Sequence, residues 1–269
     1  MNPRILVNSQ ETATVSILDR GLLYGDGVFR TLRLRAGEPV WWREHLHKLN
    51  QDCIRLDLPV FDPDIWLTDL RRCAGSSRDA IVKLIVTRGC GARGYRAEHW
   101  PEATRIVTVT EAPTSGVPAQ DVQVRLCNLR LGHQPALAGI KHLNRLENVL
   151  AQSEWHDPAI HEGLLFDQSG HLVSGTKSNV FLVKGGAMVT PSLLLCGVAG
   201  VTRARLLEIS RKSGIPSDEV DDLTLADVLD ADEILLCNSL IGLWRVARLE
   251  ARVWESPVLF PYLLERLHA

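Results

Sequence analysis

A stretch of proline and small residues at 112–120 divides the chain into two halves. It reads APTSGVPAQ and has neither the alternating nor the helical spacing of apolar residues that marks regular structure. The chain has 269 residues, so each half is long enough to bury a core of its own. We therefore predict two domains, residues 1–112 and 121–269, joined by a linker at 113–120.

Both halves mix the alternating pattern of strands with the three- and four-residue spacing of helices. In the first half, strands are predicted at 4–8, 14–18, 28–34, 40–42, 80–86 and 105–110, and helices at 44–56 and 64–73. In the second half, strands are predicted at 122–131, 163–166, 172–175, 180–183, 233–237 and 243–249, and helices from about 143, at 204–212, at 223–229 and from 257. The sequence therefore predicts an α/β (α+β) fold with two domains.

Composition and charge exclude several classes of protein. Hydrophobic residues make up 45% of the chain and charged residues 23%, which is typical of a globular protein with a substantial core. A net charge of -2 offers no positive field, so we expect neither nucleic acid nor a membrane as partner. The polar N-terminus does not resemble a signal peptide. The six cysteines are scattered without a CxxC pair, so we expect free thiols, no metal site and a cytoplasmic protein.

One lysine is placed as a catalytic amine would be. Lys141 follows a small-residue turn, Ala138-Gly139, and precedes a predicted helix in which Leu146, Val149 and Leu150 share a face. A lysine at such a point can be held by the scaffold while its amine reaches a carbonyl cofactor, although most lysines are simply solvated. The other five lie in strands, turns or helices, and Lys48 by itself is interpreted as a solvated charge.

Two glycine-rich stretches are candidates for binding anions. The stretch 197–203 leads into the predicted helix 204–212, and a helix start of this kind leaves amides free for a phosphate, although many such starts bind nothing. The stretch 87–95 carries Arg88, Arg93 and Tyr95, and its guanidinium groups could bind a carboxylate. It could equally be an ordinary hairpin with exposed cations.

Five stretches taken together show a family resemblance. In order along the chain, they are 19–29, 141–150, 174–181, 197–203 and 237–240. They resemble the signature blocks of fold type IV pyridoxal phosphate enzymes, which include branched-chain and D-amino-acid aminotransferases and 4-amino-4-deoxychorismate lyases. Stretches 87–95 and 141–146 look like the lyase branch. Arg145 stands where the branched-chain aminotransferases usually have tyrosine, and Arg30 where they tend to have glutamate.

The resemblance implies a fold, a cofactor and a set of site residues. The expected protein is a homodimer of two-domain subunits with pyridoxal 5'-phosphate (PLP) between the domains. Its implied reaction is an α,β-elimination that releases pyruvate from 4-amino-4-deoxychorismate and leaves 4-aminobenzoate for folate synthesis. Lys141 would hold the cofactor as a Schiff base and move the substrate proton. The other implied cofactor-binding residues are Lys48, Arg145, Ser174, Asn179, Val201, Thr202 and Ser239, and the implied substrate-binding residues are Tyr24, Arg93 and Tyr95.

Two residues depart from the family pattern. Lys48 stands where the family normally has a phosphate-binding arginine, which keeps the charge but loses the planar fork. Ser174 stands where a glutamate normally keeps the pyridine nitrogen protonated, and a hydroxyl supplies no such charge. A weaker electron sink favours elimination over transamination. Two alternatives remain open: a D-amino-acid or branched-chain aminotransferase of the same fold, and a PLP-binding protein with impaired catalysis.

Overall fold

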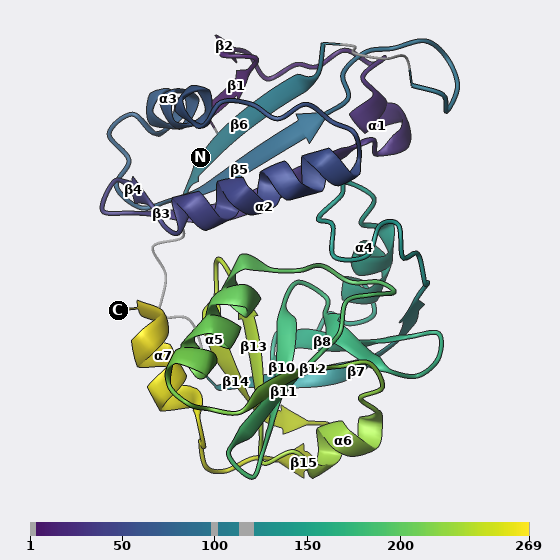
Figure 1. The fold of residues 1–269 in the computed structure, drawn as a ribbon, viewed down its shortest axis with the longest axis vertical. Helices are drawn as coiled ribbons and strands as arrows, with labels where there is room; N and C mark the ends of the chain where they lie inside the picture. The colour runs from purple at the N-terminus through teal and green to yellow at the C-terminus, as the bar shows by residue number, and fades with distance from the viewer. Residues whose placement is uncertain (1–3, 98–101, 113–120, 269) are drawn as a thin grey trace. The chain divides into compact units, whose positions relative to one another are not determined.

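The computed structural model describes residues 4–97, 102–112 and 121–268, and the chain forms two compact units (Figure 1). The first unit comprises residues up to 115 together with Lys141–Asn144. The second comprises 116–140 and 145–269. The predicted linker, 113–120, lies outside the described residues.

The first unit is built on an antiparallel sheet with the strand order β2-β1-β6-β5-β3-β4. Its strands are β1 (Arg4–Val7), β2 (Gln10–Glu11), β3 (Gly27–Arg35), β4 (Glu38–Pro39), β5 (Ala80–Thr87) and β6 (Thr104–Glu111). Its helices are α1 (Arg20–Tyr24), α2 (Trp42–Arg55) and α3 (Pro63–Ala74). Along β5 every second side chain from Ala80 to Val86 is buried, so one face of the sheet forms the core beneath α2 and α3 (Figure 1).

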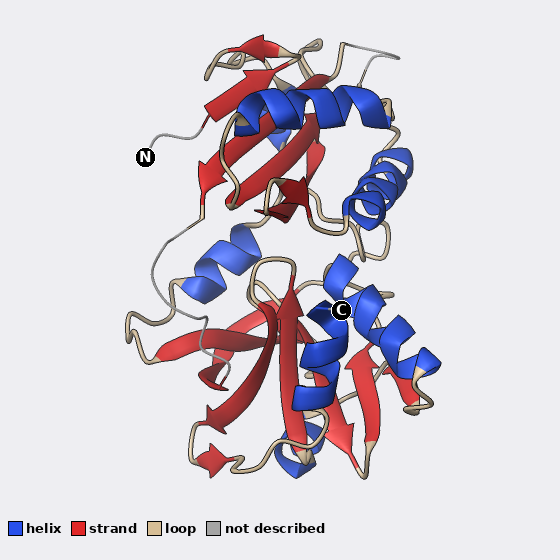
Figure 2. Ribbon diagram, turned by 90° about the vertical axis from the view of Figure 1, so that its left-hand side faces the viewer, coloured by secondary structure: helices blue, strands red, loops and turns tan. Residues whose placement is uncertain are grey.

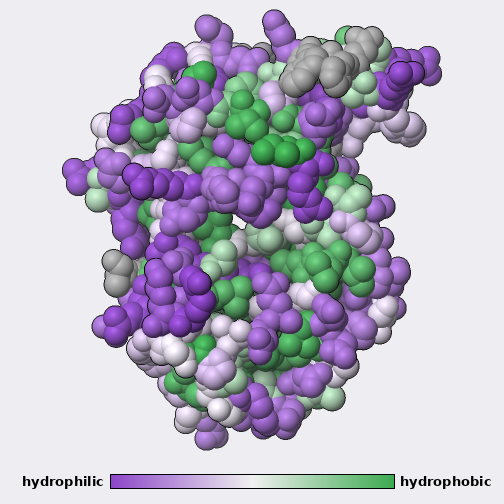
Figure 3. Space-filling model, viewed as in Figure 1, coloured by the Kyte–Doolittle hydropathy of each residue, from purple (hydrophilic) through white to green (hydrophobic). Residues whose placement is uncertain are grey.

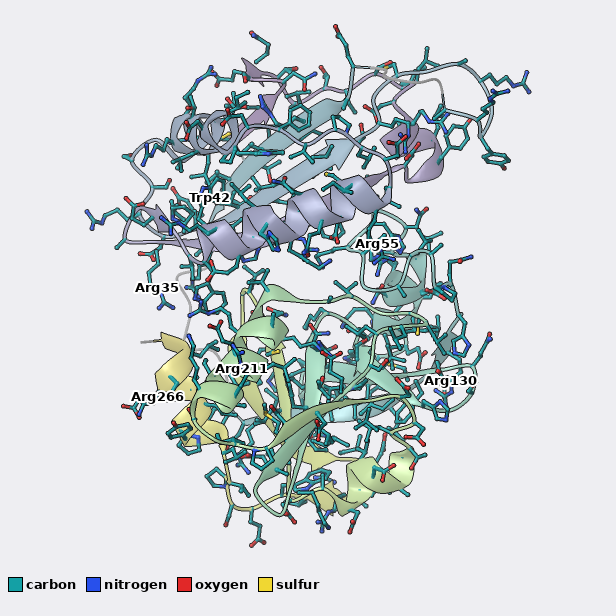
Figure 4. All side chains as sticks on the ribbon, in the orientation of Figure 1. Arg35, Trp42, Arg55, Arg130, Arg211 and Arg266 are labelled. Carbon is teal, nitrogen blue, oxygen red and sulfur yellow. The ribbon has the colours of Figure 1, made fainter. Side chains whose placement is uncertain are left out.

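The sequence explains both long helices of this unit. Helix α2 buries Leu46, Leu49 and Cys53, which recur at helical spacing; Figure 4 labels Trp42 and Arg55 at its two ends. Helix α3 begins with a capped turn: Asp62 accepts a hydrogen bond from the Asp64 amide, and Pro63 follows it.

The second unit is built on a strongly twisted sheet (Figure 2). In the described part of the chain its strand order is β12-β11-β10-β13-β14-β7-β8-β9, with β15 paired to β14. The strands are β7 (Asp121–Leu131), β8 (Ile160–Asp167), β9 (Leu172–Gly175), β10 (Asn179–Lys184), β11 (Ala187–Pro191), β12 (Ser217–Val220), β13 (Glu233–Asn238), β14 (Gly242–Leu249) and β15 (Arg252–Val253). The helices are α4 (Leu146–Gln152), α5 (Val201–Lys212), α6 (Leu225–Asp230) and α7 (Phe260–His268), and α5 and α7 lie side by side (Figure 1).

Two predicted strands are wrong. No strand forms at 14–18, where Ile17 and Leu18 are exposed and the chain turns into α1. At 40–42 the strand is missing because Trp41 adopts a left-handed conformation with φ 52° and α2 starts at Trp42. The short elements α1, β2, β4, β11, β12 and β15 were not predicted.

The segment that carries Lys141 also differs from the prediction, which placed Lys141 in the second domain, just before a helix that begins near residue 143. Residues Lys141–Asn144 belong to the first unit instead. The reason is a pair of backbone hydrogen bonds, from Phe29 N to Lys141 O (3.0 Å) and from Leu143 N to Gly27 O (2.9 Å), which add this segment to the edge of β3. Helix α4 begins only at Leu146, and its predicted apolar face is exposed in the isolated chain.

Candidate active site

Lys141 is held in place through two hydrogen bonds of its backbone. Besides its carbonyl, which accepts from Phe29, its amide N–H donates to Asp52 Oδ2 at 3.1 Å. The Nζ atom lies 4.5 Å from the centre of the Phe29 ring, a cation–π distance, and the residue is half-buried. The scaffold therefore fixes the position of the Lys141 Cα atom, and the length of the four-carbon side chain limits how far Nζ can extend from it.

A buried cluster of charges lies beside this lysine. Asp52 on α2 is fully buried, and its carboxylate accepts from Arg30 on β3 and from Lys48 one turn earlier on α2. Burial lowers the pKa of Lys48 and of Arg30, and the charge of Asp52 opposes that effect on both. The interpretation of Lys48 as a solvated charge is wrong, because its side chain is only 17% exposed and is paired.

A buried histidine, His45, lies on the same helix as Lys48 and Asp52. It is 2% exposed, and neither ring nitrogen has a hydrogen-bond partner among the described residues. Burial, with the charges of Arg30 and Lys141, lowers its pKa to about 3, so the imidazole is neutral at physiological pH. Sequence reasoning missed both His45 and Asp52. The only signal was the four-residue spacing of Lys48 and Asp52, which places both on one face of a helix.

The start of α5 in the second unit provides an anion cradle. The helix is preceded by Gly200, so no side chain caps its first turn. The Thr202 hydroxyl is buried and has no hydrogen-bond partner among the described residues. The Asn179 amide donates to Val198 O at 2.8 Å, and a Cβ on Gly200 would come within 2.3 Å of Asn179 Oδ1. Asn179 therefore holds the loop in place, while the free amides and the Thr202 hydroxyl suit a phosphate.

The chain ties this cradle to the segment that leads to Lys141. The Gly139 amide donates to Gly197 O at 3.0 Å, and the Ala199 amide donates to Gly139 O at 3.1 Å. Only Ile140 separates Gly139 from Lys141. Within the second unit, the segment that leads to Lys141 is therefore hydrogen-bonded to the cradle loop as far as Gly139.

Three further predicted residues belong to the second unit. Ser174 lies on β9 and is buried; Arg145 immediately precedes α4; and Ser239 lies in the turn after β13, where Asn238 Oδ1 accepts from the Leu240 and Ile241 amides. A glutamate that sequence reasoning did not single out stands close by on β8.

That glutamate, Glu162, is fully buried and organises the turn between β9 and β10. It accepts from the Gly163 and Thr176 amides at 3.0 Å each, from Ser178 Oγ at 2.9 Å, and also from the Thr176 hydroxyl. Its oxygens are thus committed to the protein.

The predicted substrate residues gather at one end of the first unit. The Tyr24 hydroxyl accepts from the Gly94 amide at 3.3 Å, and the Tyr24 and Tyr95 rings lie 5.5 Å apart. Arg20 braces the loop by donating to Gly94 O (2.8 Å) and Tyr95 O (2.9 Å). The side chain of Arg93 is exposed and that of Tyr95 is 89% exposed, so both are available to a ligand.

Comparison with known proteins identifies the family. The model of the family described as amino-transferase class IV matches residues 27–249, which is most of the chain. The chain belongs to the class IV aminotransferase family. That span includes β3, the Lys141 segment and the α5 cradle.

Individual class IV proteins resemble the chain over nearly its whole length. An aminodeoxychorismate lyase of Vibrio harveyi is 35% identical over 260 residues, which cover 95% of this chain and 94% of the relative. A putative branched-chain-amino-acid aminotransferase of Methanocaldococcus jannaschii is 32% identical, covering 91% and 85%. The crystal structure of 4-amino-4-deoxychorismate lyase from Pseudomonas aeruginosa superimposes with a TM-score of 0.92 at 41% identity, covering 98% of each chain.

Two further findings describe this class IV chain. Among the described residues, no group of three or more histidine, cysteine or acidic side chains is arranged to hold a metal ion. No helix in the described ranges is long and apolar enough to cross a membrane.

Proposed function

We propose that the chain is a PLP-dependent lyase that converts 4-amino-4-deoxychorismate into 4-aminobenzoate and pyruvate. The observation that carries the proposal is the 41% identity to a 4-amino-4-deoxychorismate lyase whose structure superimposes at a TM-score of 0.92. The Vibrio harveyi relative, also named as this lyase, supports it. The product, 4-aminobenzoate, would serve folate synthesis.

The residues present fit the cofactor. Lys141 offers an amine on a fixed backbone, and the unpartnered Thr202 hydroxyl with the uncapped start of α5 offers a phosphate site. We assign the phosphate to Val201, Thr202 and Ser239, with Lys48 supplying a positive charge and Asn179 holding the loop. Arg145 and Ser174 are assigned to the ring, and Tyr24, Arg93 and Tyr95 to the substrate.

In the proposed reaction Lys141 moves one proton. When bound, PLP supplies an electron sink for the electron pair released at the substrate carbon beside the nitrogen. The Lys141 amine accepts the proton from that carbon; the electron pair forms the ring double bond, and the bond from the ring to the enolpyruvyl oxygen breaks. The departing group gains a proton and becomes pyruvate, while the ring becomes aromatic.

Ser174 favours elimination over transamination. Its hydroxyl can hydrogen-bond a ring nitrogen but cannot hold a compensating charge there, and Glu162, the nearby buried carboxylate, is committed to backbone amides and hydroxyls. A weaker sink suits a reaction in which the leaving group departs as the proton is removed.

The test compares wild type with Lys141→Ala, scoring 4-aminobenzoate and pyruvate from the same incubation. Wild type should form both in equal amounts, and the variant should form neither. Equal activity of the two proteins would overturn the assignment.

A second candidate function is amino transfer, favoured by the identity to the putative branched-chain aminotransferase. Incubation with pyruvate or 2-oxoglutarate and an amino donor distinguishes the two functions. Rapid amino transfer without 4-aminobenzoate formation would favour this candidate.

We also propose that the protein is a cytoplasmic homodimer. Apolar side chains on α4, Leu146, Val149 and Leu150, are 74%, 56% and 61% exposed, and Ile17 is 77% exposed. Figure 3 shows hydrophobic surface at the place that α4 has in Figure 1. Surface of this kind is typical of a subunit interface, and the six free cysteines suit a reducing compartment. Light scattering of the purified protein at micromolar concentration should give twice the mass of 29.9 kDa.

A further inference from the structure

The surroundings of the Lys141 amine are crowded with cations and contain one buried carboxylate in direct contact with the lysine backbone. On β5, Lys83 Nζ lies 4.8 Å from the centre of the Phe29 ring, the same ring that Lys141 Nζ approaches to 4.5 Å. On α2, Asp52 holds the Lys141 amide N–H at 3.1 Å. The charged and titratable groups on the elements around the lysine segment include Arg30 on β3, Lys83 on β5, His45, Lys48 and Asp52 on α2, and the neighbouring His142.

These charges act on the amine in opposite directions. A nearby cation favours the neutral form of an amine, whereas a nearby carboxylate favours the ammonium form. Only the neutral amine can attack a carbonyl or accept a proton. Since Asp52 is fully buried and paired with both Arg30 and Lys48, its charge is poorly screened by solvent.

We propose that Asp52 is a positioning residue whose buried negative charge, opposed by Arg30, sets how readily the Lys141 amine gives up its proton. The inference rests on the proposed function only in taking Lys141 as the reactive amine. Asp52 thus does two things: it fixes the lysine backbone through the amide N–H, and it offsets the positive field of the neighbouring cations.

Two variants distinguish an electrostatic role of Asp52 from a purely structural one, because an electrostatic role shifts the pKa of the Lys141 amine in opposite directions in the two. Asp52→Asn and Arg30→Met break the same ion pair, so a structural role predicts similar damage from both. A charge role predicts that Asp52→Asn makes the amine easier to deprotonate and Arg30→Met makes it harder. A unit charge roughly 6–8 Å away, at an effective dielectric of about 20–80, shifts a pKa by about one unit. In the double variant the two charge effects should cancel to within a few tenths of a unit.

The experiment measures the pH midpoint for acetylation of Lys141 in the cofactor-free full-length protein, using acetic anhydride and mass spectrometry of the lysine peptides. Lys184 and Lys212, with side chains 56% and 69% exposed, serve as internal references. The expected result is a midpoint about one unit lower in Asp52→Asn, about one unit higher in Arg30→Met, and near wild type in the double variant. Shifts of the same sign in both single variants, or no shift in either, would overturn the proposal.

A matched control comes from a second buried ion pair in the same unit. Asp69 is 2% exposed and accepts from Arg105 at 2.8 Å, and it lies on α3 rather than on α2, whose Asp52 holds the Lys141 amide. Asp69→Asn should lower stability and leave the Lys141 midpoint unchanged; a shift equal to that of Asp52→Asn would count against the proposal. If Asp52→Asn does not fold, Lys48→Met removes a cation at a less buried position and should raise the midpoint.

A separate experiment tests whether Lys141 is the lysine that binds the cofactor, as the proposed function requires. Borohydride reduction of the PLP-loaded protein followed by peptide mapping shows which lysine carries the cofactor. Label elsewhere than Lys141 would defeat the functional assignment, whereas the acetylation midpoints would still decide whether Asp52 controls this amine.

Discussion

Replacing Thr202 by valine should have opposite effects on the empty protein and on cofactor binding. Valine has the shape of threonine and the same branching at Cβ, so the change removes little except the hydroxyl. That hydroxyl is buried at 1% residue exposure and has no hydrogen-bond partner in the described part of the chain. A buried polar group without a partner costs about 1–3 kcal/mol. Thr202→Val should therefore stabilise the cofactor-free protein by about 1 kcal/mol or more.

The same change should weaken PLP binding. A hydrogen bond to a charged group contributes about 1.5–3 kcal/mol, so loss of the one from Thr202 to the phosphate should raise the Kd for PLP roughly 10- to 100-fold. Urea unfolding of the cofactor-free protein gives the first quantity. Titration with PLP, followed by its visible absorbance, gives the second.

Ser210 supplies the matched control, because its hydroxyl also lies buried and unpartnered on α5 among the described residues, two turns beyond Thr202. Ser210→Ala should leave the Kd for PLP unchanged. If Thr202→Val destabilised the empty protein and bound PLP as tightly as wild type, the cradle at the start of α5 would not be the phosphate site.

Two further predictions concern charge. Ser174→Glu should strengthen the electron sink, so transamination of PLP with an amino donor should increase relative to pyruvate release; an unchanged product ratio would contradict the role given to Ser174. His45 has a folded-state pKa of about 3, below its ordinary value of 6.5, so the unfolded chain takes up a proton first as pH falls. Wild type should lose up to about 1.4 kcal/mol of stability per pH unit below 6.5 from this group, and His45→Leu should flatten that slope in urea unfolding between pH 4.5 and 7.5. Equal slopes in both proteins would show that His45 is not held neutral.

Local sequence patterns correctly predicted the helices and strands that bury one regularly spaced apolar face in the core. The β5 alternation and the Leu46, Leu49 and Cys53 stripe of α2 both matched, because each reflects burial against a single face. The strand predicted at 14–18 failed for the complementary reason. Ile17 and Leu18 are apolar but exposed, so their spacing does not indicate a face that packs against the core of the same chain.

The site was predicted less completely, because its decisive contacts join residues far apart in the sequence. The Lys141 segment joins the first unit through hydrogen bonds to Gly27 and Phe29, which lie more than 100 residues earlier in the sequence. A local sequence pattern cannot predict contacts between residues so far apart. Arg30 was noticed only as a departure from the aminotransferase pattern. Its partner Asp52 became evident only when the fold placed β3 beside α2.

Ser174 and the charges around Lys141 point to the same kind of reaction under the proposed roles. At the position that we assign to the ring nitrogen, the chain has a neutral hydroxyl, Ser174, where a carboxylate would stabilise positive charge on the ring. At the amine, it has gathered cations around Lys141 and balanced them with one carboxylate, Asp52. Under the proposed roles, control over the reaction would then lie with Lys141, the group that moves the proton. An elimination needs this arrangement more than amino transfer does, because its leaving group removes the electron pair that a stronger sink would otherwise have to hold.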